Sequence, residues 1–337
     1  MIECIFTIDY EIYGNGEGSL KELVYEPTER LIETFQRWDA RFVTFVEAAE
    51  LEMIEAEGTD PHIDLVKRQI RDFYEEGFEL GLHLHPQWYN GRYENGRWLL
   101  DESEYNLCTL SKERIAHIVE RSLDYLRNVL GKGDFTPLSF RAGNWLFQPT
   151  GIAASVLAEQ GIKIDSSVFK GGLQHNNGLD YRPALNNGFY WRFQDDVNVH
   201  DPNGRLIELP TYSVMVPSWE MVTPKRVGMG QKSSSSSLRG LKKFRRYLDF
   251  LRLRYPLKLD FCRMTLSELT RIMDVAIRED QEDPISFRPI VAIGHTKDLI
   301  DFKTIELFLS YLRDRGIPVS TFEAAYPRCG QQRALWP

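Results

Sequence analysis

The sequence has few of the features that mark secreted, membrane-spanning or nucleic-acid-binding proteins. Its 337 residues include 4 cysteines, which lie far apart without a Cys-x-x-Cys pair, so we expect reduced thiols and no disulfide framework. The sequence contains no run of about 18 apolar residues, the length needed to cross a bilayer. Its first residues lack the basic and apolar segments of a signal peptide. The net charge of −8 disfavours nucleic acid as a partner. These absences predict a cytoplasmic protein of ordinary globular composition.

Patterns typical of buried strands alternate with patterns typical of helices along most of the chain. For example, Ile63, Val66, Ile70 and Phe73 recur at helical spacing, and Gly77 follows them as a stop signal. Strands are expected over residues 2–9, 41–48, 78–86, 137–144, 162–168 and 288–296. The alternation predicts an α/β fold with parallel strands, and about seven such units indicate a distorted (β/α)7 TIM-like barrel.

The chain is expected to form one domain over residues 1–327, followed by a tail over 328–337. The pattern is less regular between about 170 and 257, which we interpret as an inserted irregular and basic segment. Within it, residues 189–193 and 205–210 are expected to pair as a hairpin around the sequence DPNG.

The second half of this insertion is rich in serine and then in basic and aromatic residues. Five consecutive serines at 233–237 predict a flexible loop. In the basic part, 239–258, Leu241, Phe244 and Leu248 share one side at helical spacing. One interpretation is an ordinary amphipathic helix on the barrel. The other is a contact with a membrane surface or an anionic ligand, which would suit a lipid-linked or phosphorylated substrate.

Two histidines stand one residue apart where the third expected strand ends, in the sequence GLHLHPQW. His83 and His85 would point to the same face of that strand, and imidazole is a common metal ligand. Asp9 and Glu11 have the same spacing at the end of the first strand. Two imidazoles and one of these carboxylates could hold a divalent ion and leave one coordination position open, as catalytic zinc sites do.

Titratable residues end five of the expected strands, whereas buried parallel strands are normally apolar. The set comprises Asp9 and Glu11, His83 and His85, Arg141, Asp165, and His295. The C-terminal strand ends of a β/α barrel carry its chemistry. The carboxylate that does not bind metal could act as general base and His295 as general acid, so the set suffices for metal-assisted hydrolysis.

Three of these residues also have ordinary structural explanations. Arg141 could form a salt bridge with Asp165 inside the barrel. Asp165 could instead cap the turn that follows it, because aspartate and serine favour such local bonds. His295 could be a hydrogen-bonded strand-end residue without a catalytic role.

The order of the motifs resembles that of the polysaccharide deacetylases, the NodB-homology superfamily or carbohydrate esterase family 4. The family motifs TFDDG, HxxxH-P, RxPxG-like, DxxxW and leucine–histidine are matched here by TIDYE, GLHLHP, FRAGNW, DSSVF and AIGHT. The resemblance extends from Ile2 to about Ala325, with residues 170–257 poorly matched. It implies a TIM-like barrel with a metal-dependent deacetylase site.

The resemblance also implies a role for each matching residue. Asp9 corresponds to the catalytic base, Arg141 to the arginine that tunes this base, and His295 to the histidine that protonates the leaving amine. His83 and His85 correspond to the metal-binding histidines.

The remaining correspondences are less regular. Asp165 corresponds to the aspartate of the fourth motif, with Phe169 at the tryptophan position. Tyr10 stands where the family has a second aspartate, so Glu11 is expected to replace that aspartate as metal ligand. The histidines are spaced HxH, and the third motif reads RAGN without its usual proline. These departures predict a divergent member of the family.

We therefore expect a metal-dependent hydrolase that removes an acyl group, acetyl in the first instance, from an N-acylated sugar or glycan intermediate of polysaccharide or lipopolysaccharide biosynthesis. The expected cofactor is zinc, with cobalt, nickel or manganese as alternatives. The expected location is the cytoplasm, peripheral to the inner membrane if residues 239–258 contact lipid. Two alternatives remain: a hydrolase of another non-peptide C–N bond, of the deformylase or amidase type, and a non-catalytic glycan-binding barrel. A glycoside hydrolase, which needs two carboxylates flanking the scissile bond, fits the paired histidines poorly.

Overall fold

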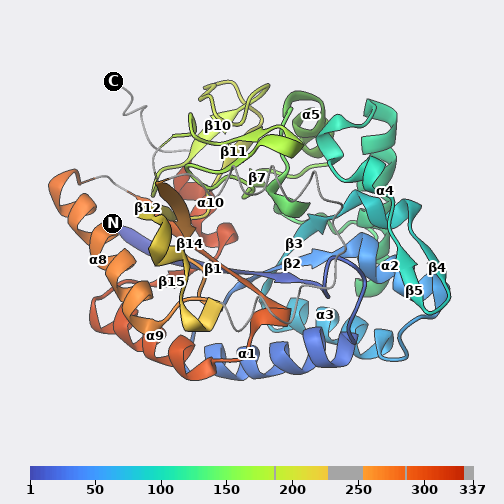
Figure 1. Cartoon of the computed structure of the whole chain (residues 1–337), viewed down its shortest axis with the longest axis horizontal. Coiled ribbons are helices and arrows are strands. Elements are labelled where there is room, and N and C mark those ends of the chain that lie inside the picture. The colour runs from blue at the N-terminus through green and yellow to red at the C-terminus, as the bar shows by residue number, and fades with distance from the viewer. Residues whose placement is uncertain (186, 227–252, 285–286, 330–337) are drawn as a thin grey trace.

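A computed structural model describes residues 1–185, 187–226, 253–284 and 287–329. It contains a nine-stranded sheet with the order β10-β11-β7-β6-β3-β2-β1-β14, and β15 pairs with β1 (Figure 1). The strands are β1 (Ile2–Tyr10), β2 (Val43–Glu47), β3 (Glu79–Leu84), β6 (Ser139–Ala142), β7 (Ile164–Asp165), β10 (Trp191–Phe193), β11 (Leu206–Glu208), β14 (Arg288–His295) and β15 (Val319–Ser320). Neighbours run parallel except in the β10–β11 pair. The predicted α/β fold is confirmed.

The sheet curls into a barrel whose last gap is closed by single bridges. Thr211 forms parallel bridges to Phe169 on one side and to Val291 on the other. Asp260 forms a further parallel bridge to Ile293 of β14. The predicted distorted TIM-like barrel is therefore confirmed, and its distortion lies between β11 and β14.

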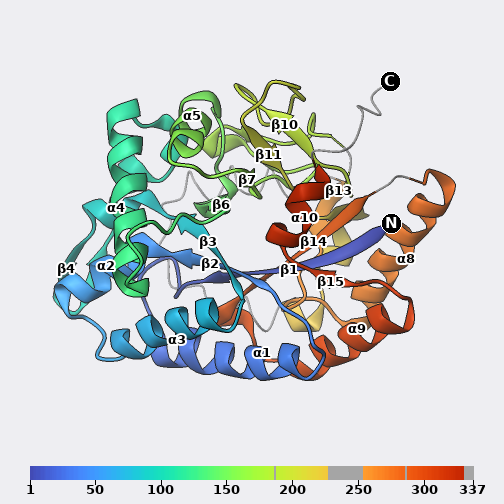
Figure 2. The same cartoon turned by 180° about the vertical axis from the view of Figure 1, so that it is seen from behind.

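The helices surround the strands in both views of the molecule (Figures 1 and 2). They are α1 (Glu26–Gln36), α2 (Ala48–Glu57), α3 (Ile63–Glu75), α4 (Lys112–Leu130), α5 (Gly151–Glu159), α8 (Leu266–Glu282), α9 (Phe302–Asp314) and α10 (Phe322–Cys329). Their apolar faces pack on the sheet, as when Phe35 of α1 meets Phe6 of β1 edge-on with ring centroids 5.1 Å apart. Burial of one such side chain contributes roughly 1.5–3 kcal/mol.

The end of the barrel where the strands begin is covered by α10. Phe322 and Ala325 share a buried cluster with Ile5, Val43 and Phe45 from the barrel interior. This arrangement leaves the opposite end, where the strands finish, for polar groups.

Local signals account for several helix boundaries. Ser111 accepts a hydrogen bond from Arg114 N at 3.2 Å and begins α4, as its sequence predicts. The helix ends at Gly131, whose φ of 66° is left-handed. The helix α2 is absent from the sequence-based prediction because Glu47, the last residue of β2, is itself its N-cap, so no loop separates the two elements.

The inserted segment joins the barrel more closely than its sequence suggests. The predicted hairpin is confirmed as β10–β11, and β11 also pairs in parallel with β7 of the barrel. Two further strands, β12 (Ser213–Pro217) and β13 (Arg254–Lys258), form an antiparallel ribbon. The serine run at 233–237 and the proposed helical face of 239–258 lie outside the described residues, and the end of that segment forms β13.

Two short hairpins lie outside the main sheet. They are β4 (Arg92–Glu94) with β5 (Arg97–Leu99), and β8 (Leu173–Gln174) with β9 (Leu179–Asp180). In the described parts of the chain, no helix is both long and apolar enough to cross a bilayer.

Candidate metal centre

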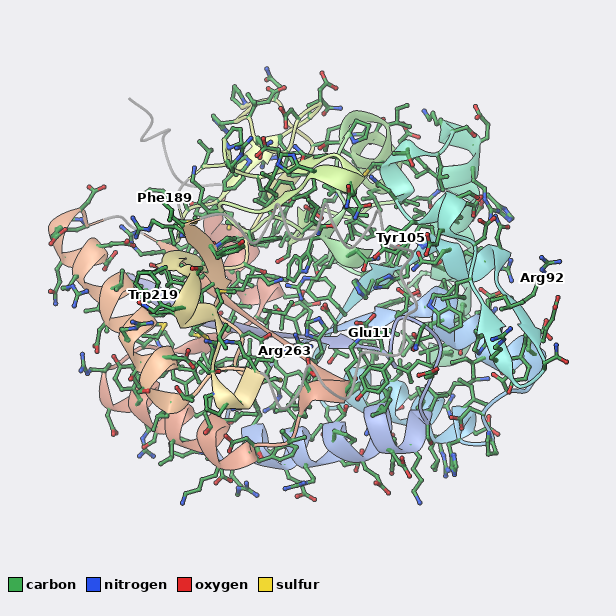
Figure 3. All side chains as sticks on the ribbon, in the orientation of Figure 1. Glu11, Arg92, Tyr105, Phe189, Trp219 and Arg263 are labelled. Carbon is green, nitrogen blue, oxygen red and sulfur yellow. The ribbon has the colours of Figure 1, made fainter. Side chains whose placement is uncertain are left out.

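Strand register brings the candidate residues together. Asp9 of β1 is paired with His295 of β14, and His83 of β3 is paired with Arg141 of β6. Glu11 follows β1 and lies in the middle of the molecule, whereas Arg92 lies at its edge (Figure 3). All of these strand ends face one another because they are the C-terminal ends of neighbouring parallel strands.

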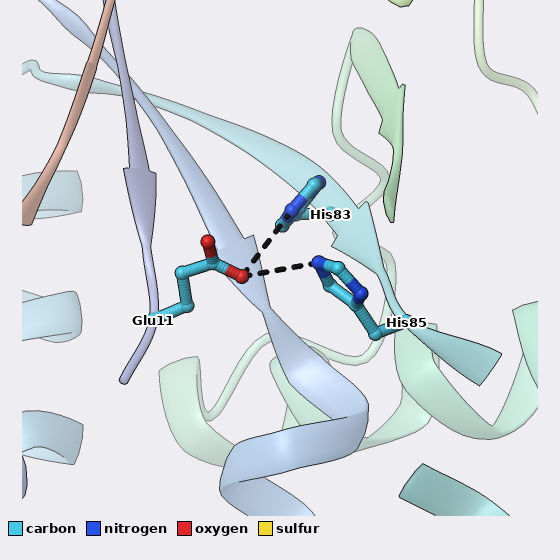
Figure 4. A group of neighbouring side chains, drawn as sticks. All are labelled: Glu11, His83 and His85. Atoms are coloured by element: carbon cyan, nitrogen blue, oxygen red, sulfur yellow. Dashed lines mark ion pairs between the residues drawn. The ribbon is translucent and has the colours of Figure 1, made fainter. Parts of the chain in front are cut away.

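Glu11, His83 and His85 converge on one point (Figure 4). Oε2 of Glu11 lies 3.6 Å from Nε2 of His83 and 3.1 Å from Nε2 of His85. The two imidazole rings are nearly perpendicular, with centroids 4.9 Å apart. One ligand atom from each residue lies within 4.8 Å of the others, which is the spacing that one coordinated ion requires.

The hydrogen bonding of His83 tests whether this cluster fits a cation. Nδ1 of His83 lies 2.8 Å from the carbonyl oxygen of Arg141, which can only accept, so Nδ1 carries a proton. In neutral His83 the Nε2 lone pair then faces a carboxylate oxygen of Glu11, and only a proton or a metal ion between them relieves the repulsion. Burial alone would lower the pKa of His83, but Asp9 and Glu11 outweigh it and raise this pKa to about 9. Two imidazoles and a carboxylate are the donor set of hydrolytic zinc sites, so the residues fit a divalent ion.

Amide side chains hold the other face of His85. Its Nδ1 lies 3.2 Å from Nδ2 of Asn144 and 3.4 Å from Nε2 of Gln87. Oε1 of Gln87 is buried and has no hydrogen-bond partner among the described residues. Both amides present a nitrogen to Nδ1 in this arrangement. Half-turns of both amides would let an amide oxygen accept Nδ1–H and leave Nε2 of His85 free to bind metal.

Asp9 lies beside this cluster and is held ionised. Its Oδ1 accepts a hydrogen bond from Arg141 Nη1 at 2.7 Å, and its Oδ2 lies 3.4 Å from Nε2 of His295 and 4.0 Å from Nε2 of His83. Burial would raise the pKa of Asp9, but the charges of Arg141, His83 and His295 together lower it below its usual value. Asp9 is thus a carboxylate available to accept a proton.

Arg141 is completely buried and every bond it makes orients it toward Asp9. Nη2 donates to Thr7 Oγ1 at 2.9 Å and to Ser166 Oγ at 3.1 Å, and Nε donates to Ser166 O at 3.0 Å. The guanidinium also lies 4.2 Å from the ring centre of Phe45. Its ion-pair partner is Asp9. The Arg141–Asp165 salt bridge that the sequence allowed as an alternative does not form.

Asp165 stands apart from the other candidates. Its carboxylate accepts hydrogen bonds from Ser167 Oγ at 2.6 Å and Ser167 N at 3.2 Å, the local turn that the sequence allows as an alternative. Asp165 is in register with Phe140 and Glu208. Side chains alternate along a strand, so the next residue, Ser166, meets Arg141 instead.

His295 faces the same oxygen of Asp9 that lies near His83, and one ligand atom from each of Asp9, Glu11 and His295 also lies within 4.8 Å of the others. Burial lowers the pKa of His295, and the charge of Asp9 offsets only part of that effect. Its Nδ1 is buried without a hydrogen bond among the described residues, and Asp298 Oδ2 lies 3.8 Å away. The lowered pKa of His295 favours the neutral imidazole over the imidazolium, and its Nε2 faces Oδ2 of Asp9.

Sequence reasoning missed two charged residues that contact the cluster. Lys297 Nζ donates to Glu11 Oε1 at 2.7 Å, and together with the histidines it holds the pKa of Glu11 well below normal despite burial. Glu47 accepts from His85 N at 2.7 Å, and burial raises its pKa to about 7. Both could have been found: Glu47 ends β2, and Lys297 lies two residues beyond His295.

No protein-family model and no curated protein matches this sequence. Solved structures do match it. A Mycobacterium smegmatis protein assigned as a polysaccharide deacetylase aligns with a TM-score of 0.52 at 14% identity, over 100% of this chain and 94% of that chain. TK1436, a GH57 branching enzyme from Thermococcus kodakaraensis in complex with glucose, aligns with a TM-score of 0.55 at 12% identity, over 98% of this chain and 72% of that chain.

These alignments establish a shared fold. The chain is a β/α barrel of the kind found in that deacetylase and in that branching enzyme. The resemblance to polysaccharide deacetylases predicted from the sequence is confirmed in the fold. Since the same fold serves different chemistries, the choice between them depends on the site.

Proposed function

We propose that the protein is a metal-dependent hydrolase that removes an acetyl group from an N-acetylated sugar. The observation that carries the proposal is the convergence of Glu11, His83 and His85 beside an ionised Asp9, whose Oδ2 also faces Nε2 of His295. The likeness in fold to a protein assigned as a polysaccharide deacetylase supports it. We place the reaction in the assembly of a polysaccharide or lipopolysaccharide in the cytoplasm.

Glu11, His83 and His85 would hold the ion, for which zinc suits two nitrogen donors and one oxygen donor. A bound divalent ion supplies Lewis-acid activation of water and of the amide carbonyl. Asp9 accepts the proton of the attacking water at Oδ2. Arg141 keeps Asp9 ionised and oriented through the bond to Oδ1.

His295 completes the proton path. Its Nε2 lies 3.4 Å from Asp9 Oδ2, so a proton taken up by Asp9 can pass to His295 and from there to the leaving amine. The low pKa of His295 favours delivery of this proton, because an imidazolium with a lowered pKa is a stronger acid.

The alternatives differ in what they require of these side chains. A glycoside hydrolase needs one carboxyl group protonated as general acid. Asp9 and Glu11 both have lowered pKa values, and Glu47, whose pKa is raised to about 7, accepts backbone hydrogen bonds from His85 N and Glu50 N. A glycan-binding barrel needs neither a base nor an acid. A hydrolase acting on a different C–N bond, such as a formamide, would use the same site and is separated only by its substrates.

Metal content and acyl release test the proposal together. We expect about one divalent ion per chain by elemental analysis, lost in His83→Ala and retained in His62→Ala, whose imidazole is paired with Asp60 away from the cluster. Acetate release from N-acetylated sugars should follow metal content. A parent protein that binds none of zinc, cobalt, nickel or manganese after stripping and reloading would refute the mechanism and favour the binding-protein alternative.

A further inference from the structure

Most cations around the candidate metal centre are matched by a carboxylate. Three of them have a carboxylate oxygen at 2.6 or 2.7 Å: the pairs are Arg141–Asp9, Lys297–Glu11 and Arg263–Asp298. Lys258 is different. Among the described residues, no carboxylate lies within ion-pair distance of its ammonium group.

Lys258 instead faces two aromatic rings. Its Nζ lies 4.0 Å from the ring centre of Trp145 and 4.6 Å from that of Phe169. Trp145 also links Lys258 to the candidate metal centre, since the guanidinium of Arg141, the partner of Asp9, lies 5.5 Å from the centre of the Trp145 ring. Cation–π contacts attract the ammonium without neutralising it.

The backbone places Lys258 at the barrel wall beside the site. It ends β13 opposite Ser213, and two residues later Asp260 bridges to Ile293, which lies two residues before His295. The charge of Asp260 favours the ammonium form of Lys258, but this carboxylate forms its ion pair with Arg263 at 4.0 Å. Its Oδ1 accepts hydrogen bonds from the backbone N–H groups of Cys262 and Arg263.

The aromatic partner is also held in an unusual conformation. Trp145 has a φ of 67°, in the left-handed region that bulky residues rarely adopt. Such strained residues cluster at functional sites. Burial lowers the pKa of Lys258 to about 8, as expected for an ammonium group with no counter-ion in contact.

We propose that Lys258 binds an anionic group of the substrate, a carboxylate or a phosphate carried by the sugar whose amide is hydrolysed. This proposal rests on the proposed function, because it assumes that the scissile amide lies at the candidate metal centre. Trp145 and Phe169 would hold the ammonium in place while it contacts the anion of the substrate. An anion from the substrate would give Lys258 the counter-charge that the described part of the protein does not supply.

Substrates that differ in charge test this directly. The set is N-acetylglucosamine, N-acetylglucosaminuronic acid and N-acetylglucosamine 6-phosphate. We expect kcat/KM to be about 10-fold or more higher for an anionic substrate than for the neutral one, since a charge-assisted bond contributes that much. Lys258→Met keeps the alkyl stem without the charge and should abolish the preference, whereas Lys258→Arg should retain part of it. The better of the two anions identifies the source of the charge, and an equal preference in parent and Lys258→Met would overturn the proposal.

A binding measurement without turnover separates this proposal from the proposed function. Lysines are reductively methylated with 13C, and the NMR signal of Lys258 is assigned by its loss in Lys258→Arg. Inorganic phosphate and acetate should shift this signal saturably, while exposed Lys303 on α9 should respond weakly and linearly. A saturable shift without acetate release from any sugar would refute the proposed function and support the anion site. Acetate release with no saturable shift at Lys258 would refute the anion site and leave the hydrolase.

Discussion

Arg141 donates to Asp9 at 2.7 Å in a place where the two side chains are 1% and 4% exposed to solvent. Breaking a buried ion pair of this kind is strongly destabilising, because removing one partner leaves the other as an uncompensated buried charge. Here that charge belongs to the residue proposed as the general base. The pair therefore links the stability of the barrel to the ionisation of its site.

Replacement of Arg141 by methionine should raise the pKa of Asp9, because burial then acts on the carboxyl group without the opposing cation. The acid limb of the kcat/KM profile should move to higher pH, since Asp9 must be ionised to accept a proton. The free energy of unfolding should fall by about 3 kcal/mol. Arg141→Lys keeps the charge and should shift the limb less. A pH–rate profile with the same acid limb in the parent and in Arg141→Met would exclude Asp9 as the base.

Gly143 is required by the close passage of the chain beside His85. A Cβ at this position would lie 2.5 Å from Leu84 O and 2.8 Å from Nδ1 of His85. Gly143→Ala should therefore displace the imidazole and weaken metal binding by about 10–100-fold, the cost typical of lost second-shell support. Gly133→Ala is the matched control, because nothing lies within 4 Å of its Cβ. Competition with a chromophoric chelator measures both affinities, and equal values would contradict the prediction.

Lys297 should couple protein stability to metal binding. Lys297→Met leaves the buried Glu11 carboxylate without its cation, which should cost about 3 kcal/mol in the metal-free protein. A bound divalent ion would compensate that charge, so the loss should be smaller in excess zinc. Denaturant unfolding with chelator and with zinc measures the difference, and exposed Lys303→Met serves as control. The same loss under both conditions would show that no cation binds at Glu11.

The candidate site residues at the strand ends were predictable, because a charged or imidazole side chain is unusual in an otherwise apolar strand. This signal identified Asp9 and His295 on the two longest strands of the barrel, β1 and β14, whose paired registers then bring them together. Helix boundaries were predictable where a cap is encoded locally, as at Ser111. The α/β barrel followed from the same alternation of patterns.

Contacts between distant segments could not be predicted in this way. Asp165 matches the family motif, but it lies on β7, which has only two residues and pairs Asp165 with Glu208. The following residue, Ser166, accepts the hydrogen bond from Arg141. Lys258 reaches the site through the pairing of β13 with β12, more than 40 residues earlier. Neither relationship has a signature in a single stretch of sequence.

Glu79 provides a stability prediction far from the site, at the start of β3. Its carboxyl group is 4% exposed and accepts a hydrogen bond from Glu323 N at 2.8 Å. Burial raises its pKa to about 8, so between pH 4.5 and 8 the folded protein retains a proton that the unfolded chain releases. The contribution of Glu79 to stability is therefore complete at low pH and decreases as pH rises through this range.

Glu79→Gln removes this titration and keeps an oxygen to accept Glu323 N–H. The free energy of unfolding of the variant should exceed that of the parent increasingly with pH, by about 3 kcal/mol more at pH 7.5 than at pH 5, since one pKa unit corresponds to about 1.4 kcal/mol. Exposed Glu57→Gln should follow the parent at every pH. Urea unfolding at half-unit pH steps measures all three proteins. Parallel curves for Glu79→Gln and the parent would mean that Glu79 is ionised in the fold, and that a charge buried at the closed end of the barrel is compensated there.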